Sequence, residues 1–297
     1  FKHQIMEKKF KSLSIAHFLS KFGTENDCFE HLVQLKWGNK YACGHCGNKK
    51  YCKAVRLYDR QCSRCSYIES PTSGTIFHKI KFSLVKAFQI VYFLATNKKG
   101  ISSCQLARTL QLRQKTCWLF KQKIMRAMES TNRHPLEGNV EIVEFEIGHI
   151  SKKEDRELKD TTQKVLIAIE KKSLGASRIY ATELQDLGVD ICRKFILKKV
   201  SLDATIHAID KSPFNNLKSE GLMVELFDSS NTKMNSSTSK RVVNCLKNWI
   251  TTIHCNVKYL QQYLDEYCYR HNRHLMKEEI IDDLLGRMVR HKPAPYK

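Results

Sequence analysis

The sequence lacks any hydrophobic run long enough to cross a membrane. Its longest apolar stretch, residues 88–95, is interrupted by Gln89 and falls far short of the ~20 residues that a spanning helix needs. The sequence also shows no lipidation signal and no strongly amphipathic basic segment. We therefore expect no association with a membrane.

The sequence also lacks a signal-peptide pattern and a disulfide framework. Of the twelve cysteines, four have the spacing of metal ligands and most others are scattered singly. This usage is typical of a reducing compartment, where thiols stay free. We expect a cytoplasmic protein, associated with the nucleoid because its charge favours DNA.

Acidic residues are scarce. The 30 Asp and Glu residues face 51 Lys and Arg residues, which gives a net charge of +21 spread along the chain. Such a field attracts polyanions, so double-stranded DNA is the leading partner. An acidic membrane surface would attract the same charge, but it ranks behind DNA because the amphipathic and lipidation signals are missing. With 297 residues, the chain is long enough for two or three domains.

Two pairs of cysteines form the clearest motif. Cys43 and Cys46 make one CxxC pair, and Cys62 and Cys65 make the second after fifteen intervening residues. Two such pairs place four thiolates on two tight turns around one Zn²⁺ ion, which predicts a zinc ribbon. Four protein ligands leave no open position, so the zinc is expected to be structural. The alternative is four unligated core cysteines; the nearby His45 and Cys52 are expected not to be ligands.

A helix-turn-helix pattern follows. A buried helix from residue 81 precedes a short helix over residues 101–110, a turn, and a second helix over residues 113–124. Polar side chains in the first turn of that second helix can reach base edges, while nearby cations can meet phosphates. The residues expected at DNA are Arg113, Gln114, Lys115 and Thr116 for bases, and Lys98, Lys99, Arg108 and Lys121 for phosphates. The alternative is a three-helix connector with a solvated basic face.

The second half of the chain predicts a mixed α/β domain. Residues 138–148 form one strand in which Val140 and Ile142 share a face, while Glu141, Val143 and Phe145 share the other. Sequential strands followed by an alternating helix and strand indicate a sheet with helices on its faces. Strands are also expected at residues 164–170, 177–183 and 204–209, and helices at 10–22, 26–37, 190–199, 236–249, 256–273 and 278–290.

Spaced motifs over nearly the whole chain resemble the ISXO-like insertion-sequence transposases of bacteria. Besides the CxxC pairs, the motifs are residues 72–78, 99–102, 105–108, 115–118, 136–138, 204–207 and 263–266, with Arg270, Asn272 and Arg273. The resemblance implies an α+β multidomain protein, in which a zinc ribbon and a helix-turn-helix precede a ribonuclease-H-like mixed α/β domain. The expected boundaries are residues 1–40 for N-terminal helices, 41–80 for the ribbon, 81–134 for the DNA-binding segment and 135–297 for the last domain.

The resemblance also implies three acidic residues that hold two divalent ions for DNA strand transfer. Their positions correspond here to Val143, Ile209 and Lys240. Valine and isoleucine cannot bind a cation, and an ammonium repels one. We therefore expect no catalytic residue and no Mg²⁺, and we expect Lys240 to contact a DNA phosphate instead.

A rewired acid cluster is the alternative. Its candidates are Glu144, Glu146, Asp203, Asp210 and Glu220, which lie near the expected positions in the sequence. A shift of one residue along a strand turns a side chain to the opposite face, however, unless a bulge intervenes.

The sequence thus favours a catalytically inactive DNA-binding protein, derived from a transposase, that occupies or bridges DNA sites. Two other functions stay open. One is an active DDE-type transposase with metal-dependent strand transfer, and the other is an interaction module for RNA or an acidic protein. A homodimer, and a partner protein that supplies activity, also stay open.

Overall fold

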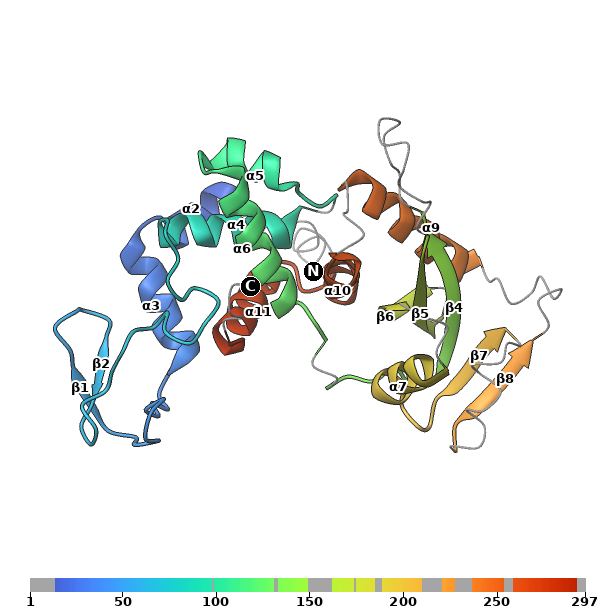
Figure 1. Cartoon of the computed structure of the whole chain (residues 1–297), viewed down its shortest axis with the longest axis horizontal. Coiled ribbons are helices and arrows are strands. Elements are labelled where there is room, and N and C mark those ends of the chain that lie inside the picture. Colours follow the sequence, from blue (N-terminus) through green and yellow to red (C-terminus); the bar gives the residue numbers. More distant parts are fainter. Residues whose placement is uncertain are drawn as a thin grey trace, which may run out of the picture. The chain divides into compact units, whose positions relative to one another are not determined.

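The computed structural model describes residues 14–97, 99–130, 133–148, 162–173, 175–184, 189–209, 221–227, 237–253 and 259–292. The chain forms two compact units (Figure 1). We call Phe1–Met128 together with Leu275–Lys297 the ribbon–helix unit, and Glu129–His274 the sheet unit. No helix in the described part of the chain has the length and hydrophobicity to cross a bilayer.

Two helices open the ribbon–helix unit, α2 (Ile15–Lys21) and α3 (Glu25–Lys36). The hydroxyl of Thr24 accepts from the Asp27 N–H at 3.2 Å, and the Asp27 carboxylate accepts from the Thr24 N–H at 2.9 Å. This capping box satisfies two N-terminal donors at once, so α3 begins one residue earlier than the sequence predicted. The part of the first predicted helix that precedes residue 14 lies outside the described residues.

The ribbon itself is a small antiparallel sheet in the order β1-β2-β3. Its strands are β1 (Tyr51–Lys53), β2 (Arg60–Cys62) and β3 (Ile68–Glu69). Its core is correspondingly small: Trp37 and Tyr41 pack with the buried Cys43 and Cys62. Because so little apolar surface is buried, the ribbon needs a source of stability besides its core.

Three further helices are α4 (Leu84–Thr96), α5 (Ser103–Leu110) and α6 (Gln114–Ala127). The hydroxyl of Ser102 caps α5 by accepting from the Gln105 N–H at 3.1 Å. Gln111 ends α5 in the left-handed region with φ 52°, which turns the chain tightly into α6. The N-terminus of α4 is capped from another helix, since Glu25 of α3 accepts from the Leu84 N–H at 2.8 Å.

The last helix, α11 (Glu279–Arg290), belongs to the ribbon–helix unit. It packs against α3, α4 and α6, and the Ile76 N–H donates to its Met288 carbonyl at 3.1 Å. The expectation that the final domain runs from residue 135 to residue 297 is therefore wrong at its C-terminal end. A local pattern predicts that a helix forms but not which distant helices it covers.

The described residues of the sheet unit form five strands in the order β6-β5-β4-β7-β8. The strands are β4 (Asn139–Ile147), β5 (Gln163–Lys172), β6 (Gly175–Leu184), β7 (Thr205–Ile209) and β8 (Met223–Phe227). β4, β5 and β6 pair antiparallel, whereas β7 pairs parallel with β4 and with β8. This order and these directions are those of the ribonuclease-H-like fold, and β8 is a strand that the sequence pattern did not predict.

Helices cover both faces of this sheet (Figure 1). Val140 and Ile142 of β4 pack in one cluster with Ile196 of α7 (Val189–Lys199). On the opposite face, Phe145 lies 5.4 Å from the ammonium of Lys247, which belongs to α9 (Ser237–Thr252). The two faces of β4 predicted from its alternating sequence are confirmed.

The remaining helix, α10 (Leu260–Asn272), lies along the edge strand β6. The side-chain amide of Asn272 accepts from the Ile179 N–H at 2.8 Å and donates to the Ile179 carbonyl at 2.9 Å. Gln261 accepts in the same way from the Glu183 N–H at 2.9 Å. These two amides satisfy backbone groups that an edge strand otherwise exposes.

Candidate nucleic-acid interface and metal centre

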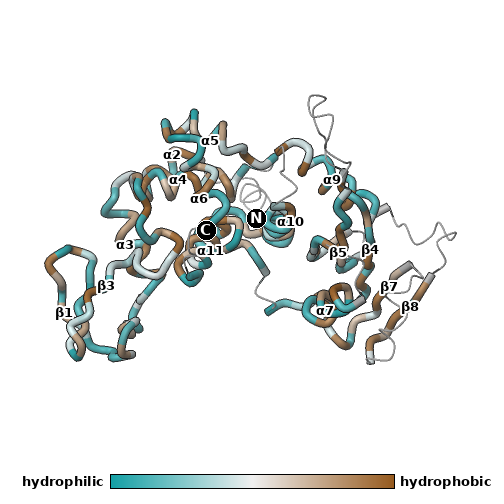
Figure 2. Tube along the Cα trace, viewed as in Figure 1, coloured by the Kyte–Doolittle hydropathy of each residue, from teal (hydrophilic) through white to brown (hydrophobic). Residues whose placement is uncertain are grey.

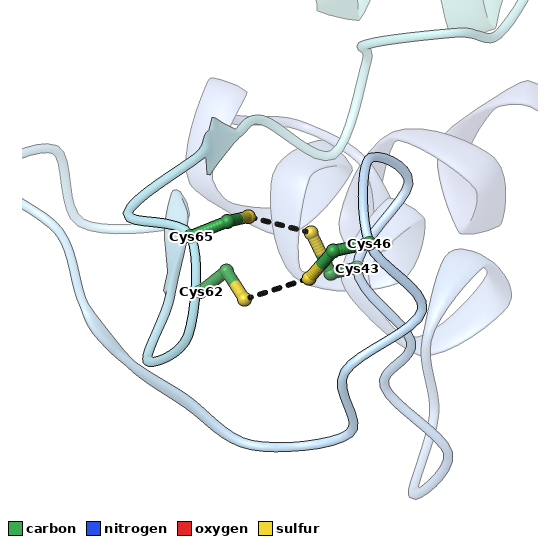
Figure 3. Close-up of side chains that lie close together, drawn as sticks. All are labelled: Cys43, Cys46, Cys62 and Cys65. Atoms are coloured by element: carbon green, nitrogen blue, oxygen red, sulfur yellow. Dashed lines mark hydrogen bonds between the residues drawn. The ribbon is translucent and has the colours of Figure 1, made fainter.

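The four predicted cysteines meet at one point, between two turns of the ribbon (Figure 3). Their sulfur atoms all lie within 4.8 Å of one another. The Cys43 and Cys65 sulfurs are 3.6 Å apart, as are those of Cys46 and Cys62. A tetrahedral zinc site with Zn–S bonds of about 2.3 Å requires sulfur separations of roughly 3.8 Å. The thiols therefore fit one structural Zn²⁺ ion. His45 and Cys52, which were expected not to be ligands, are not part of the group.

Backbone and side-chain N–H groups surround these sulfurs. The N–H of His45 donates to the Cys43 sulfur at 3.4 Å, and the N–H of Arg64 donates to the Cys62 sulfur at 3.4 Å. Burial acts to raise the pKa of the Cys62 thiol, but donors from Cys65, Asn48 and Arg64 outweigh it and lower the pKa to about 6. These donors favour the thiolate form of Cys62, which is the form that binds zinc.

The ribbon is attached to α3 by charged side chains. The Lys36 ammonium lies 2.7 Å from the Glu69 carboxylate, which also accepts from the Gly44 N–H at 3.4 Å in the first cysteine turn. The Arg60 guanidinium lies 4.5 Å from the Trp37 ring and 4.1 Å from the Tyr51 ring. These contacts fix the ribbon against the end of α3 because each one joins different segments of the unit.

The first turn of α6 presents part of the predicted DNA-reading set. Arg113 and Lys115 are exposed, and Thr116 is half-buried. Gln114 is exposed but donates to the Ser103 hydroxyl at 2.8 Å, which joins the first turns of α5 and α6. α5, the tight turn at Gln111 and α6 follow one another, and α6 begins with exposed cationic side chains.

Two of the four predicted phosphate contacts are exposed, Lys99 and Arg108. Lys121 is not available, because its side chain is 3% exposed and its ammonium donates to the Ile101 carbonyl at 2.9 Å. The expectation that Lys121 binds a phosphate is wrong, since the lysine instead joins α6 to the start of α5. Lys98 lies outside the described residues.

The positions at which the resemblance expects catalytic acids lie on neighbouring strands. Ile142 of β4 pairs with Ala208 of β7, so Val143 and Ile209 each follow that pair by one residue. Val143 shares a face with Phe145, against which α9 packs. Lys240 is exposed in the first half of that same helix.

The acids considered as substitutes for the missing catalytic residues do not gather at one point among the described residues. Glu144 lies on the α7 face of β4, and its carboxylate lies 3.9 Å from the Lys164 ammonium. Burial raises the pKa of the nearby Cys192 thiol, and the charge of Glu144 raises it further. Glu146 and Asp203 are exposed. Asp210 and Glu220 lie outside the described residues. Among the residues that are described, the four cysteines form the only group of three or more potential ligands close enough to hold a metal ion.

One charged row was not predicted. Glu141 of β4, His207 of β7 and Glu225 of β8 pair in register across the three parallel strands. Glu141 is 2% exposed and lies 3.3 Å from the Lys171 ammonium, while the His207 ring lies 3.2 Å from the Glu225 carboxylate. The sequence shows Glu141 as an acid in a largely apolar strand. That His207 and Glu225 lie beside it can be known only from the order of the strands in the sheet.

Two segments of the chain match models of known families. Residues 135–272 match the ISXO2-like transposase domain, and residues 23–68 match the transposase zinc-ribbon domain. Among solved structures, the chain is similar to the crystal structure of a pre-cleavage Mos1 transpososome, at 10% sequence identity and a TM-score of 0.22, over 70% of this chain and 79% of that chain. No curated protein matches the chain.

Proposed function

Because two segments of the chain match the ISXO2-like transposase domain and the transposase zinc-ribbon domain, we propose that it is a transposase-derived protein that binds double-stranded DNA without cutting it. In this function the ribbon–helix unit holds a DNA site, and its zinc is purely structural. Bridging two DNA sites requires two ribbon–helix units, and we propose that a homodimer supplies them. The protein then acts on chromosomal DNA in the cytoplasm.

The observation that carries the proposal is the set of side chains at the three positions named above. Two-metal phosphoryl transfer needs carboxylates around two cations that are roughly 4 Å apart. Val143 and Ile209 instead offer hydrocarbon, and Lys240 offers an ammonium. Hydrocarbon leaves a Mg²⁺ ion without ligands, and the ammonium repels it.

The positive charge of Lys240 supports a role in DNA binding at the position where the resemblance expects a catalytic acid. A lysine on α9 attracts the DNA phosphate that the metal ions of an active enzyme would bind. We therefore assign Lys240 to phosphate binding, together with the exposed Lys99 and Arg108 of the ribbon–helix unit.

Calorimetric titration with Mg²⁺ and with Mn²⁺ tests the loss of catalysis. We expect the native chain to bind neither ion specifically in its sheet unit. The matched variant Val143→Asp/Ile209→Asp/Lys240→Glu restores an acid at each position and is expected to gain Mn²⁺ binding. Specific binding by the native chain would contradict the proposal.

Substitutions in the helix-turn-helix test DNA reading. Arg113→Ala and Lys115→Ala should each weaken binding to a fragment selected from genomic DNA by more than they weaken binding to random duplex. Lys99→Ala should weaken both alike, because a phosphate contact carries no base information. Equal losses for all three variants would show that α6 does not read bases.

An active transposase is the second candidate, and the position of Glu141 favours it. This acid lies on the same face of β4 as Val143, two residues earlier, beside His207. A strand-transfer assay with cognate terminal repeats and Mn²⁺ decides between the two functions. Product that disappears in Glu141→Gln would establish the enzyme.

A further inference from the structure

Exposed hydrophobic side chains are concentrated in the zinc ribbon. Twelve large hydrophobic residues are exposed in the described part of the chain, and five of them lie between positions 51 and 68. Single exposed apolar residues are normal on any protein, but their concentration on one small element marks a binding surface. The five are Tyr51, Val55, Leu57, Tyr67 and Ile68.

The two most exposed of these residues occupy the tip of the hairpin between β1 and β2. The relative exposure is 103% for Val55 and 77% for Leu57, with the exposed Arg56 between them. Figure 2 shows the hydrophobic colour of this loop. The Ala54 N–H donates to the Asp59 carbonyl, and the Asp59 N–H donates to the Arg56 carbonyl at 3.0 Å, so the backbone closes into a defined turn.

The tip of the hairpin is anchored on α3. Tyr58, the next residue, stacks on Phe29 of α3 with ring centroids 5.4 Å apart and planes inclined by 12°. Its hydroxyl lies 3.5 Å from the Glu30 carboxylate. Because Tyr58 is anchored on α3, the hairpin presents Val55, Arg56 and Leu57 outward on a supported turn and not on a free loop.

The charge around the tip indicates which partner it fits. Residues 39–69 contain seven Lys or Arg residues and only two acids, and one of these, Glu69, is paired with Lys36. A zinc tetrathiolate removes two further positive charges but leaves the ribbon cationic. Protein interfaces are depleted in lysine, whereas the phosphates of DNA require it. The exposed cations of the ribbon are Lys40, Lys49, Lys50, Lys53, Arg56 and Arg64.

We propose that the hairpin tip is an apolar wedge that enters the minor groove of double-stranded DNA and opens a base step. Val55 and Leu57 pack against the exposed bases, Arg56 lies in the groove, and Lys49, Lys50 and Lys53 bind the flanking phosphates. Minor-groove proteins use aliphatic wedges in this way to bend a duplex. The inference rests on the proposed DNA-binding function and adds a contact separate from the helix-turn-helix.

The experiment uses the full-length zinc-loaded protein and a duplex of about 30 base pairs with central TpA steps, which are the easiest to unstack. The duplex carries 2-aminopurine at one step to report unstacking and a dye at each end to report bending. Val55→Ser/Leu57→Ser is compared with Leu275→Ser, which changes a residue of 79% exposure in the same unit. Zinc content and thermal unfolding of each variant establish that it is folded.

We expect the native protein and Leu275→Ser to raise 2-aminopurine fluorescence and to bring the dyes closer. Val55→Ser/Leu57→Ser should lose most of both signals and bind about tenfold more weakly. Its affinity should keep the native dependence on salt, because its phosphate contacts are unchanged. Arg56→Ala should reduce the slope of log affinity against log salt by about 0.9.

If Val55→Ser/Leu57→Ser gives the same 2-aminopurine and dye signals as the native protein, the wedge is overturned. The proposed DNA-binding function still holds in that case if Arg113→Ala weakens binding. Failure of the native protein to bind any duplex would overturn both. Loss of self-association by the double variant, with unchanged DNA signals, would assign the tip to a second copy of the chain and overturn the wedge as well.

Discussion

At the scale of single residues, two lysines of α6 have opposite surroundings. Lys115 is exposed in the first turn, whereas Lys121 is 3% exposed and donates to the Ile101 carbonyl at 2.9 Å. A buried charged donor contributes to stability through the hydrogen bond that it makes, whereas an exposed one can bind a ligand. The same residue type therefore has a structural role at one position and an available charge at the other.

Alanine at these two positions should separate stability from binding. Lys121→Ala removes a charge-assisted hydrogen bond and should lower the free energy of unfolding by about 2 kcal/mol. Lys115→Ala should change it by less than about 0.5 kcal/mol, because the side chain is exposed. Urea unfolding and DNA titration of both variants check this, and a Lys121→Ala protein as stable as the native one would contradict the burial.

Asp265 of α10 should make the sheet unit sensitive to pH. Burial raises the pKa of its carboxyl to about 7, against the lowering effect of the Gln261 amide, which donates to it at 3.2 Å. The folded protein then binds the proton more tightly than the unfolded chain, whose Asp pKa is about 3.9. The stabilisation from this group is complete below about pH 4 and is lost as the pH rises to about 7.

Asp265→Asn should remove that dependence, since an amide does not titrate. Urea unfolding of the sheet unit at about pH 5 and about pH 8 should then give more similar stabilities than in the native protein. Asp203→Asn, at an exposed turn, is the control and should keep the native difference. An unaltered pH dependence in Asp265→Asn would rule out this carboxyl as its source.

At the scale of elements, the ribbon has a very small core and a group of four cysteine sulfurs that lie close together. Chelation of zinc should unfold residues 41–69 and expose them to trypsin, while the sheet unit keeps its protection. Cys62→Ser should have the same effect without a chelator. Cys52→Ser is the matched control, because Cys52 is an exposed ribbon cysteine outside the four-thiol group. Limited proteolysis followed by mass spectrometry measures the result, and a ribbon that resists trypsin without metal would disprove a structural role for zinc.

The elements differ in how well the sequence predicts them. β4, β5 and β6 are long and rich in β-branched residues, and CxxC pairs have a fixed geometry, so both were predicted within a few residues. β8 was not predicted, although with five residues it is as long as β7, which was predicted. The burial of Lys121, the cap that Glu25 gives to α4, and the Glu141 row depend on partners that are distant in sequence. Local patterns carry no information about such partners.

At the scale of the whole molecule, the ribbon–helix unit is built from both ends of the chain. α11 buries Ile281, Leu284, Leu285 and Met288, and it packs on α3, α4 and α6. A chain that ends after His274 should therefore lose the stability of the ribbon–helix unit and its DNA binding, while the sheet unit stays folded. A chain that ends after Lys292 retains α11 and is the control. Hydrogen exchange measured by mass spectrometry reports the two units separately, and native protection of α4 in the shorter chain would refute the dependence.

The return of α11 to the first unit also sets an order of events during synthesis. Domains usually fold as they leave the ribosome, beginning at the N-terminus. Here the ribbon–helix unit, which carries the four-cysteine group together with α5 and α6, still awaits α11 when the sheet has already emerged. A prematurely terminated polypeptide consequently contains every predicted base-reading residue but lacks the packing that holds them in position.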